Sequence, residues 1–175
     1  MKPRVRLAPV ACVLVLAVGL LTSACSRARD AAAHGTPETQ ALAASPADCG
    51  HAVCADHFFI DAAPATCTTG SPCSTTLKLV ATGDFHVNDE YPYRFKADDA
   101  PGVAFLGTDS NGNSTFSKSA GDWQKSDAKT GVMTVKFVAA DPGSKAIAGT
   151  LKLSVCSAQA CLLEQRQVTA SVLTK

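Results

Sequence analysis

Apolar and polar side chains alternate along much of the chain from residue 76 onward, and this period of two restricts the fold more than any other feature of the sequence. In four segments the apolar residues share one parity: Leu77, Leu79 and Ala81; Met133, Val135 and Phe137; Ile147, Leu151, Leu153 and Val155; and Val168, Ala170 and Val172. Only Gly149 interrupts the third series. Strands of antiparallel sheets show this pattern because they pack one face on a core and expose the other. The alternation therefore predicts an all-β protein, and we find no sequence segment typical of a long amphipathic helix.

Turn-forming sequences separate these segments, and each contains glycine, proline, asparagine or aspartate. They are Gly70-Ser71-Pro72, Asp99-Ala100-Pro101-Gly102, Ser110-Asn111-Gly112-Asn113 and Asp141-Pro142-Gly143. About seven short strands fit between residues 49 and 175, and this number and spacing are typical of two-sheet sandwiches. We therefore predict an immunoglobulin-like antiparallel β-sandwich over 49–175, with a closed barrel as the alternative.

The first 24 residues have the features of a secretion signal. Lys2, Arg4 and Arg6 make a basic start, and an apolar run of about fifteen residues follows and ends at Leu21. This run is shorter than the ~20 residues of a membrane span. It leads into Leu21-Thr22-Ser23-Ala24-Cys25, which resembles the lipobox cleaved by the bacterial lipoprotein signal peptidase.

This resemblance implies a lipoprotein signal peptide over 1–24 and a mature chain that begins at Cys25, which carries diacylglycerol and an acyl chain such as palmitate. Stable attachment needs more than one acyl chain. Ser26 is not the aspartate that favours retention at the inner membrane, so we expect a cell-envelope protein anchored in the outer membrane and facing the periplasm. An ordinary signal peptide or an uncleaved anchor is the alternative.

Loss of residues 1–24 leaves 13 basic residues against 15 acidic ones, because the leader holds three of the 16 Lys and Arg and none of the Asp and Glu. The mature chain therefore lacks the basic footprint of a nucleic-acid-binding protein. Residues 26–48 contain eight alanines, two prolines and no aromatic residue. Such a segment cannot bury enough apolar surface to offset the entropy lost on ordering. We predict that 25–48 is a lipidated cysteine followed by a flexible tether of roughly 25 Å, with a short helix at 41–44 as the alternative.

Six of the eight cysteines lie in 49–175 as three close pairs. The pairs are Cys49 and Cys54, Cys67 and Cys73, and Cys156 and Cys161. Six thiols allow fifteen connectivities, but an even number in a secreted protein favours disulfides. We expect the second pair to staple a hairpin turned at Gly70 and Pro72, and the first pair to clip the N-terminal edge of the domain.

The first pair has a second interpretation, because Cys49, His51, Cys54 and His57 supply two thiols and two imidazoles. Four such ligands can surround zinc tetrahedrally. Their spacing matches no metal motif known to us, and an oxidising compartment disfavours free thiolates, so zinc is the weaker alternative. No Cys-x-x-Cys-His haem motif occurs, and we expect no cofactor.

The third pair lies between two strand segments and carries the most specific motif. A strand at 149–155 runs into Cys156-Ser-Ala-Gln-Ala-Cys161, and a last strand follows. Upstream lie the strand at 132–138, the turn at 141–143 and an aromatic-rich segment at 83–95. This order resembles the N-terminal periplasmic domain of the DsbD family of thiol:disulfide interchange proteins, over roughly residues 76–173.

The resemblance implies an immunoglobulin-like fold in which Cys156 and Cys161 are a redox pair, with electrons supplied in trans by a membrane reductase. It also implies an aromatic cap over the cysteines, for which Phe116 and Trp123 are the candidates. Two features depart from the family: the loop between the cysteines is one residue shorter, and no aromatic residue follows Cys161.

Charged residues near the third pair leave its reactivity open. A redox cysteine needs a lowered thiol pKa and access to its partner. We expect Glu164 and Arg166 to project to the same side of one strand, where Arg166 would favour a thiolate and Glu164 would oppose it. A permanent disulfide between the last two strands is therefore the alternative to a redox pair.

A cluster formed by His86 and the segment Asp89–Tyr93 also has two interpretations. It can be a binding patch of aromatic and acidic groups. Alternatively, the tyrosines of this segment and Phe95 pack inward from one strand face, while His86 lies in a solvated turn. We interpret Asp89–Glu90 and Asp98–Asp99 as exposed charge, with weak calcium binding as the alternative.

The sequence contains no motif of hydrolytic or phosphate-binding chemistry, such as Gly-x-Ser-x-Gly or His-Glu-x-x-His. We therefore expect a lipid-anchored cell-envelope module that binds another envelope protein or a thiol reductase. The alternatives are a thiol:disulfide exchange carrier that uses Cys156 and Cys161 and, more weakly, a zinc-binding module.

Overall fold

The computed structural model describes residues 49–175, and the predicted signal peptide, Cys25 and the tether lie outside the described residues. Within this range the chain forms twelve strands and no helix. The strands are β1 (Val53–Ala55), β2 (Phe58–Ala62), β3 (Ala65–Cys67), β4 (Pro72–Ala81), β5 (His86–Val87), β6 (Arg94–Ala97), β7 (Val103–Phe105), β8 (Thr115–Ser117), β9 (Trp123–Lys125), β10 (Thr130–Ala139), β11 (Gly143–Cys156) and β12 (Cys161–Thr174). A search of the same residues for a membrane-spanning helix finds none.

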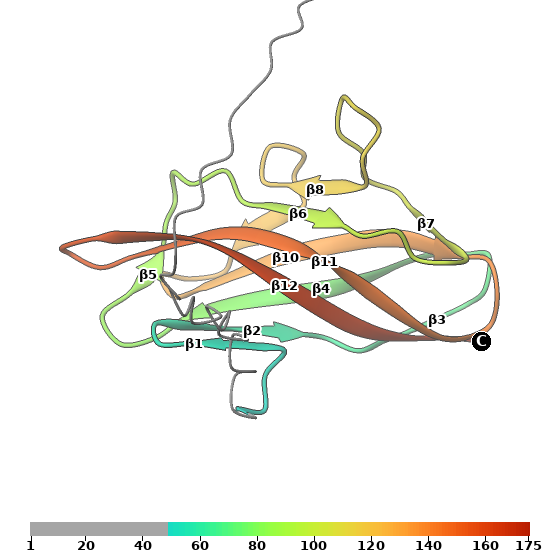
Figure 1. Cartoon of the computed structure of the whole chain (residues 1–175), viewed down its shortest axis with the longest axis horizontal. Helices are drawn as coiled ribbons and strands as arrows, with labels where there is room; N and C mark the ends of the chain where they lie inside the picture. Colours follow the sequence, from blue (N-terminus) through green and yellow to red (C-terminus); the bar gives the residue numbers. More distant parts are fainter. Residues whose placement is uncertain (1–48) are drawn as a thin grey trace, which may run out of the picture. The chain divides into compact units, whose positions relative to one another are not determined.

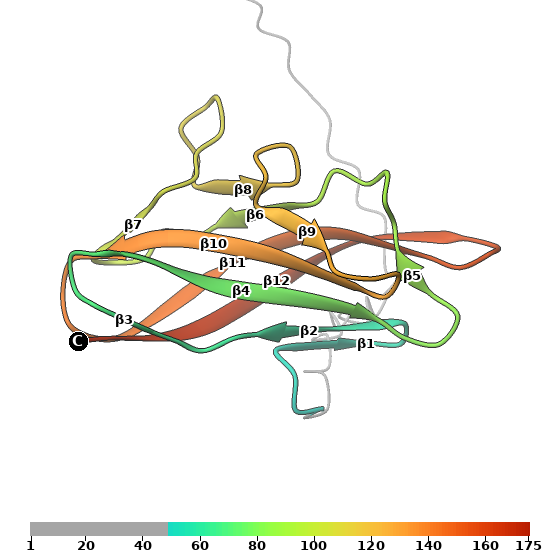
Figure 2. The ribbon, with the colours of Figure 1, turned by 180° about the vertical axis from the view of Figure 1, so that it is seen from behind.

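The strands form two sheets that pack face to face (Figures 1 and 2). One sheet has the order β1-β2-β4-β10-β7, with β9 also paired to β10. The other has the order β3-β12-β11-β6-β8, with β5 also paired to β11. Only the pairing between β12 and β3 is parallel among the described strands. The prediction of an all-β, immunoglobulin-like sandwich with local disulfides is confirmed, and the sheets do not close into a barrel.

The inward-facing residues predicted from the alternation form the core between the two sheets. Every residue of the four alternating series named above is at most 3% exposed. Their side chains come from β4 and β10 in one sheet and from β11 and β12 in the other. Burial of apolar surface, worth about 25 cal/mol per Å², therefore holds the two layers together.

Gly149 interrupts the apolar series of β11 because a neighbouring strand comes close at this point. It pairs with Ala97 of β6, and a Cβ atom at position 149 would overlap the Lys96 carbonyl oxygen and the Phe95 ring. A side chain would push β6 away, so glycine allows β6 to stay in register with β11.

The sequence predicted only about seven strands because short strands carry no readable alternation. β5, β7, β8 and β9 have two or three residues each. The four long strands, β4, β10, β11 and β12, have ten or fourteen residues and are the ones that the period of two identified.

The prediction that Cys67 and Cys73 staple a hairpin is wrong, although the disulfide forms. Cys67 ends β3 in one sheet, and Cys73 lies in β4 of the other. Between them the backbone turns at Gly70, whose φ of 74° is in the left-handed region that favours glycine. The disulfide therefore links the two layers where the chain changes sheet. A short cysteine spacing predicts a turn, but it does not say which sheet each side of the turn joins.

Candidate functional site

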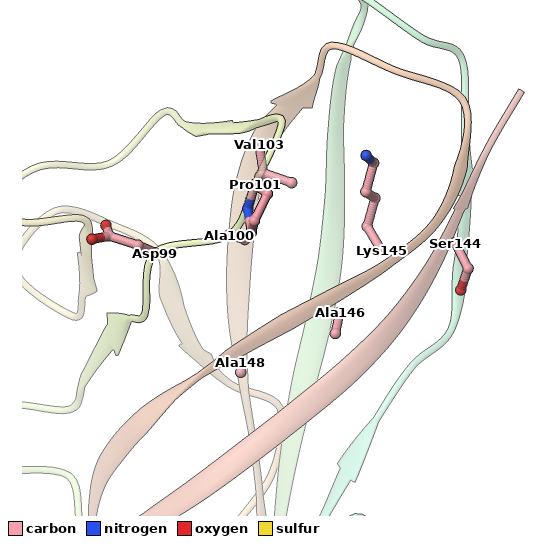
Figure 3. Close-up of a pocket in the computed structure, with 8 residues that line it drawn as sticks. All are labelled: Asp99, Ala100, Pro101, Val103, Ser144, Lys145, Ala146 and Ala148. Atoms are coloured by element: carbon pink, nitrogen blue, oxygen red, sulfur yellow. The ribbon is translucent and has the colours of Figure 1, made fainter.

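A hollow of about 450 Å³ lies where the chain crosses from β6 to β7 (Figure 3). It is lined by Asp99, Ala100, Pro101 and Val103 from the crossing and by Ser144, Lys145, Ala146 and Ala148 from β11. The charged side chains of Asp99 and Lys145 lie on either side of it, and most of the remaining lining consists of small apolar groups. No lining residue pairs a nucleophile with a base, so we place the candidate site elsewhere.

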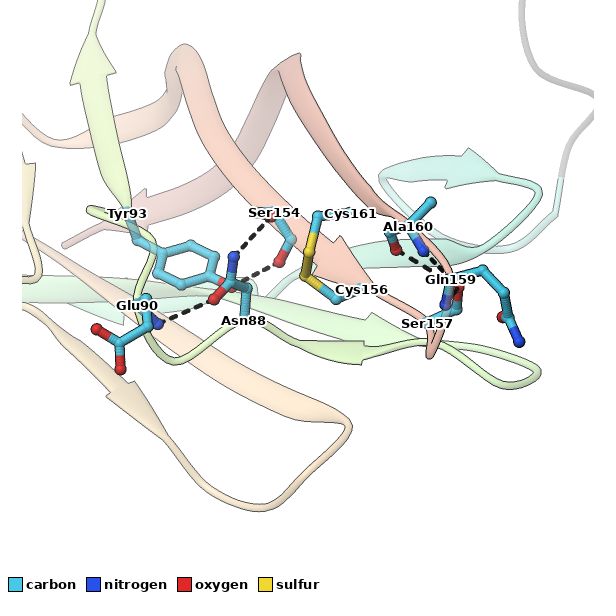
Figure 4. Close-up of a disulfide and its surroundings, with 9 residues drawn as sticks. All are labelled: Asn88, Glu90, Tyr93, Ser154, Cys156, Ser157, Gln159, Ala160 and Cys161. Atoms are coloured by element: carbon cyan, nitrogen blue, oxygen red, sulfur yellow. Dashed lines mark hydrogen bonds between the residues drawn. A yellow bond between two sulfur atoms is a disulfide. The ribbon is translucent and has the colours of Figure 1, made fainter.

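The site lies at the end of the β11–β12 hairpin, where the sequence predicted the cysteine pair (Figure 4). The two strands pair continuously, so that Cys156 lies directly opposite Cys161. These cysteines form a disulfide with a Cα–Cα distance of 4.0 Å. In the connecting loop, the Ser157 hydroxyl accepts hydrogen bonds of 3.2 Å from the N–H groups of Gln159 and Ala160. The Ser157 side chain therefore closes the loop, and the disulfide holds the two strands in this register.

The two cysteines differ in their access to solvent. Cys156 is 6% exposed, whereas Cys161 is an exposed residue. On the other side of β11, His86 of β5 lies opposite Cys156 and is itself exposed. Cys161 is therefore the more accessible residue of the two.

A buried tyrosine supports β11 beside the disulfide. The Tyr93 hydroxyl donates a hydrogen bond of 2.6 Å to the Ser154 carbonyl, and the Asn88 side-chain amide donates one of 3.2 Å to the Ser154 hydroxyl (Figure 4). The Tyr93 ring stacks on Trp123 with 3.9 Å between the ring centroids. Burial raises the pKa of the Tyr93 hydroxyl above its usual range, so this group stays a neutral donor.

Both aromatic candidates for a cap over the cysteines are core residues. Trp123 packs against Tyr93, and the Phe116 ring lies 6.5 Å from that of Phe95 and 6.2 Å from that of Phe105. Tyr93 and Phe95 are buried as predicted, but Tyr91 is only half-buried. The prediction that His86 lies in a turn is wrong, because His86 is exposed but belongs to β5, which pairs with β11. The hydrogen bond from Tyr93 to β11 was missed, because parity predicts which face a side chain occupies but not which backbone group it meets.

Glu164 and Arg166 form an ion pair on the face of β12 opposite to Cys161. The carboxylate and the guanidinium are 3.1 Å apart, and the guanidinium lies 5.8 Å from the centre of the Phe58 ring. The two side chains share a side, as predicted. Residues of odd and even number point to opposite faces of a strand, so Arg166 does not lie beside Cys161 to stabilise a thiolate there.

One edge of the hairpin is open over most of its length. β3 pairs with β12 only at Val172–Thr174, and no other strand in the described range adjoins the outer edge of β12 from Cys161 to Ser171. Leu163, which is 68% exposed, projects from this stretch. Unpaired N–H and C=O groups along a strand are a template for another strand. The open edge of β12 is therefore the part of the hairpin best suited to bind a partner.

The residues of the zinc alternative are not brought together. Cys49 and Cys54 form a disulfide. His51 Nδ1 lies 2.5 Å from Asp61 Oδ1, and the His57 ring stacks on an aromatic neighbour. Residues 49–175 contain no group of three or more His, Cys, Asp or Glu side chains that could hold a metal ion.

Two of the four acidic residues noted in the sequence, Asp89 and Asp98, have local side-chain partners. Asp89 lies 2.7 Å from the Lys125 Nζ atom, and the hydrogen bond from Lys125 lowers the pKa of the Asp89 carboxyl. Asp98 accepts a hydrogen bond of 2.6 Å from the Gln167 side-chain amide. These contacts agree with our interpretation of exposed charge.

No family model matches the chain, and no curated protein matches it. Among solved structures, AggA, the major subunit of aggregative adherence fimbriae type I from Escherichia coli, is 13% identical, with a TM-score of 0.33 over 71% of this chain and 99% of that chain. A non-cellulosomal cohesin from Archaeoglobus fulgidus is 14% identical, with a TM-score of 0.30 over 68% and 91%. A PapD-like domain of human CEP192 is 10% identical, with a TM-score of 0.28 over 66% and 84%. At these identities the similarities concern the fold alone.

Proposed function

We propose that this chain is a lipid-anchored interaction module of the cell envelope, and that it binds a protein partner along the open edge of β12. The observation that carries the proposal is the edge itself, which has no neighbouring strand from Cys161 to Ser171 within the described residues. An extended peptide that adds to such an edge gains main-chain hydrogen bonds. The exposed Leu163 offers an apolar contact beside those backbone groups.

The hairpin is rigid before a partner arrives, which lowers the entropy cost of binding. β12 pairs with β11 along its whole length. The disulfide at Cys156–Cys161 closes one end, and the hydrogen bond from Tyr93 holds β11 next to it. In this proposal the disulfide is a structural element that keeps β12 in register with β11.

The leader sequence supplies the location in this proposal. The lipobox-like segment that ends at Cys25 supports acylation of this residue, and Ser26 supports transfer to the outer membrane. The domain would then face the periplasm and meet other envelope proteins there.

Photo-crosslinking in cells tests the surface and the anchor together. A photoreactive amino acid replaces Leu163 in the full-length chain, and a matched control replaces Asn111, which is exposed in the loop between β7 and β8. We expect a crosslinked adduct from position 163 and none from position 111. We also expect Cys25→Ser to abolish the incorporation of labelled palmitate and to release the chain from membranes. Equal adducts at both positions, or a palmitate label that survives Cys25→Ser, would contradict the proposal.

Thiol:disulfide exchange is the second candidate function, favoured by the exposure of Cys161 and by the resemblance to the DsbD family. A thiolate of a partner dithiol protein would attack the Cys161 sulfur, form a mixed disulfide and release Cys156 as a thiolate. The second thiol of the partner would then attack the mixed disulfide. The partner ends as a disulfide and the hairpin as a dithiol, so two electrons pass to this chain.

A further inference from the structure

The hydrogen-bond pattern of the sheet fixes which residues of β12 face the open edge. At the hairpin loop, the Ser157 N–H donates to the Ala160 carbonyl at 2.8 Å, so even-numbered residues bond toward β11. At the other end, the Lys175 N–H donates to the Cys67 carbonyl at 3.0 Å, so odd-numbered residues bond toward the opposite edge. These two kinds of residue alternate along an antiparallel strand. The open edge therefore presents the N–H and C=O groups of the odd-numbered residues, among them Leu163, Gln165 and Gln167.

We propose that the partner at this edge is a second copy of the same chain, paired antiparallel with β12 about a two-fold axis at Gln165. This inference rests on the proposed function, because it takes the open edge as the binding surface. A strand that pairs with its own copy must bring edge-facing residues opposite each other, so the axis has to pass through a residue and cannot fall between two residues. The register about Gln165 has the pairs Cys161 with Thr169, Leu162 with Val168, Leu163 with Gln167, Glu164 with Arg166, and Gln165 with itself.

This register matches the charges of the two copies. Glu164 of one copy faces Arg166 of the second, and the same pair repeats across the axis. Both residues are even-numbered and form non-hydrogen-bonded pairs, in which opposing side chains are closest. On the same face, Leu162 meets Val168, so an apolar pair flanks each charged pair.

Other registers also allow the backbone groups of the two edges to form hydrogen bonds, but they do not pair the opposite charges. With the axis at Glu164 or at Arg166, that residue faces its own copy, so two like charges oppose each other. With the axis at Leu163, Glu164 faces Leu162 and Arg166 faces Ala160. With the axis at Gln167, Glu164 faces Ala170 and Arg166 faces Val168. None of these alternatives places Glu164 opposite Arg166, so the axis at Gln165 is selected.

Arg166 has the donor capacity to bind a second carboxylate. A guanidinium has five N–H donors in a planar fork. In the described part of the chain its one carboxylate contact is to Glu164, and its buried Nε atom has no acceptor there. A carboxylate from a second copy would add to the existing contact and would not have to replace it.

The same charges select against other strands. Inward-pointing charges on an edge strand oppose pairing with apolar segments, because the partner would leave them unmatched. Both charges are matched only by a strand that places a cation opposite Glu164 and a carboxylate opposite Arg166. A second copy of β12 is such a strand. Specificity would then arise because a strand of another protein leaves Glu164 and Arg166 without opposite charges.

Charge reversal tests the register by sedimentation equilibrium of the full-length chain in detergent. We expect the wild type to dimerise, and we expect Glu164→Arg and Arg166→Glu each to weaken dimerisation at least about tenfold, because each creates like-charge pairs across the axis. Lys152→Glu, on the outward face of β11, is the matched control and should dimerise like the wild type.

A mixture of the two charge-reversal variants distinguishes pairing between copies from a structural role of the Glu164–Arg166 ion pair within one chain. One variant carries Arg at both positions and the other carries Glu at both, so together they restore every opposite-charge contact between copies. Mixing cannot restore the contact within either chain. We expect the equimolar mixture to dimerise with wild-type affinity, and a mixture that stays monomeric overturns the proposal, as does a wild-type chain that is monomeric at every concentration.

Gln165→Pro keeps the test decisive if a charge variant folds poorly. It removes an N–H that faces the open edge and leaves the pairing with β11 intact, so it should abolish dimerisation while circular dichroism and the melting temperature stay near the wild type. Unchanged dimerisation of a folded Gln165→Pro chain contradicts the proposal. The crosslink at position 163 distinguishes the two proposals, because an adduct with another protein and no adduct of twice the chain mass would sustain the interaction module and refute the second copy.

Discussion

At the scale of single residues, Tyr93 connects the core to the candidate site. Its ring stacks on Trp123, and its hydroxyl donates to the Ser154 carbonyl in β11. A buried hydroxyl with one partner contributes about 1 kcal/mol to the free energy of unfolding. This bond is lost if the hydroxyl ionises, because a phenolate has no proton to donate.

Tyr93 therefore predicts a pH dependence of stability. Burial raises its pKa in the folded state above the ordinary value of about 10. Above that pH the unfolded chain gives up a proton that the folded chain keeps, so the stability contribution is complete below about pH 10 and falls as the pH rises. Denaturant unfolding at pH 8 and at pH 10.5 should show this loss in the wild type and a smaller loss in Tyr93→Phe.

Tyr91→Phe is the control for this prediction, because Tyr91 is only half-buried and packs edge-on against the Tyr93 ring. We expect it to retain the wild-type decrease in stability between the two pH values. The same decrease in Tyr93→Phe and in the wild type would contradict the assignment.

Several residue-level features were predictable from the sequence. Others were not, and there are physical reasons for this. Parity identified the inward faces of the long strands, because burial on one side imposes a period of two. The opposite orientation of Cys161 and Arg166 was also available from parity. Parity does not predict which sheet β3 joins, since this depends on contacts between segments far apart in the chain. The role of Tyr93 depends on the same kind of contact.

At the scale of elements, the β11–β12 hairpin carries both the disulfide and the open edge. A structural role of the disulfide is favoured, because Cys156 is buried and the cationic Arg166 lies on the other face of β12 from Cys161. The second candidate function requires a disulfide that envelope dithiols can reduce. The reduction potential of this pair separates the two accounts.

Redox titration of the full-length chain against glutathione, with alkylation and mass spectrometry of the peptide that contains Cys156 and Cys161, measures this potential. We expect a value below about −300 mV, as for structural disulfides. The peptides that contain Cys67 and Cys73 serve as an internal comparison, because that disulfide links the two sheets. A potential near that of glutathione for Cys156–Cys161 alone would favour the exchange carrier instead.

At the scale of the whole molecule, the proposal combines three features, which are the two-sheet sandwich, the predicted lipid anchor at Cys25 and the open edge of β12. The two sheets bury their inner faces against each other and leave β12 with one open side. If Cys25 is acylated as proposed, copies confined to one membrane would have a raised effective concentration, so that weak pairing at the edge would suffice. In this proposal one copy of the chain binds a second copy along the open edge of β12.

Backbone amide exchange in β12 at increasing protein concentration tests this claim most directly. The amides of Leu163, Gln165 and Gln167 face the open edge, whereas those of Glu164 and Arg166 bond to β11. We predict that exchange at the three edge positions slows as the concentration of the full-length chain rises, while exchange at the two other positions stays slow throughout. Edge amides that exchange equally fast at every concentration would contradict the claim.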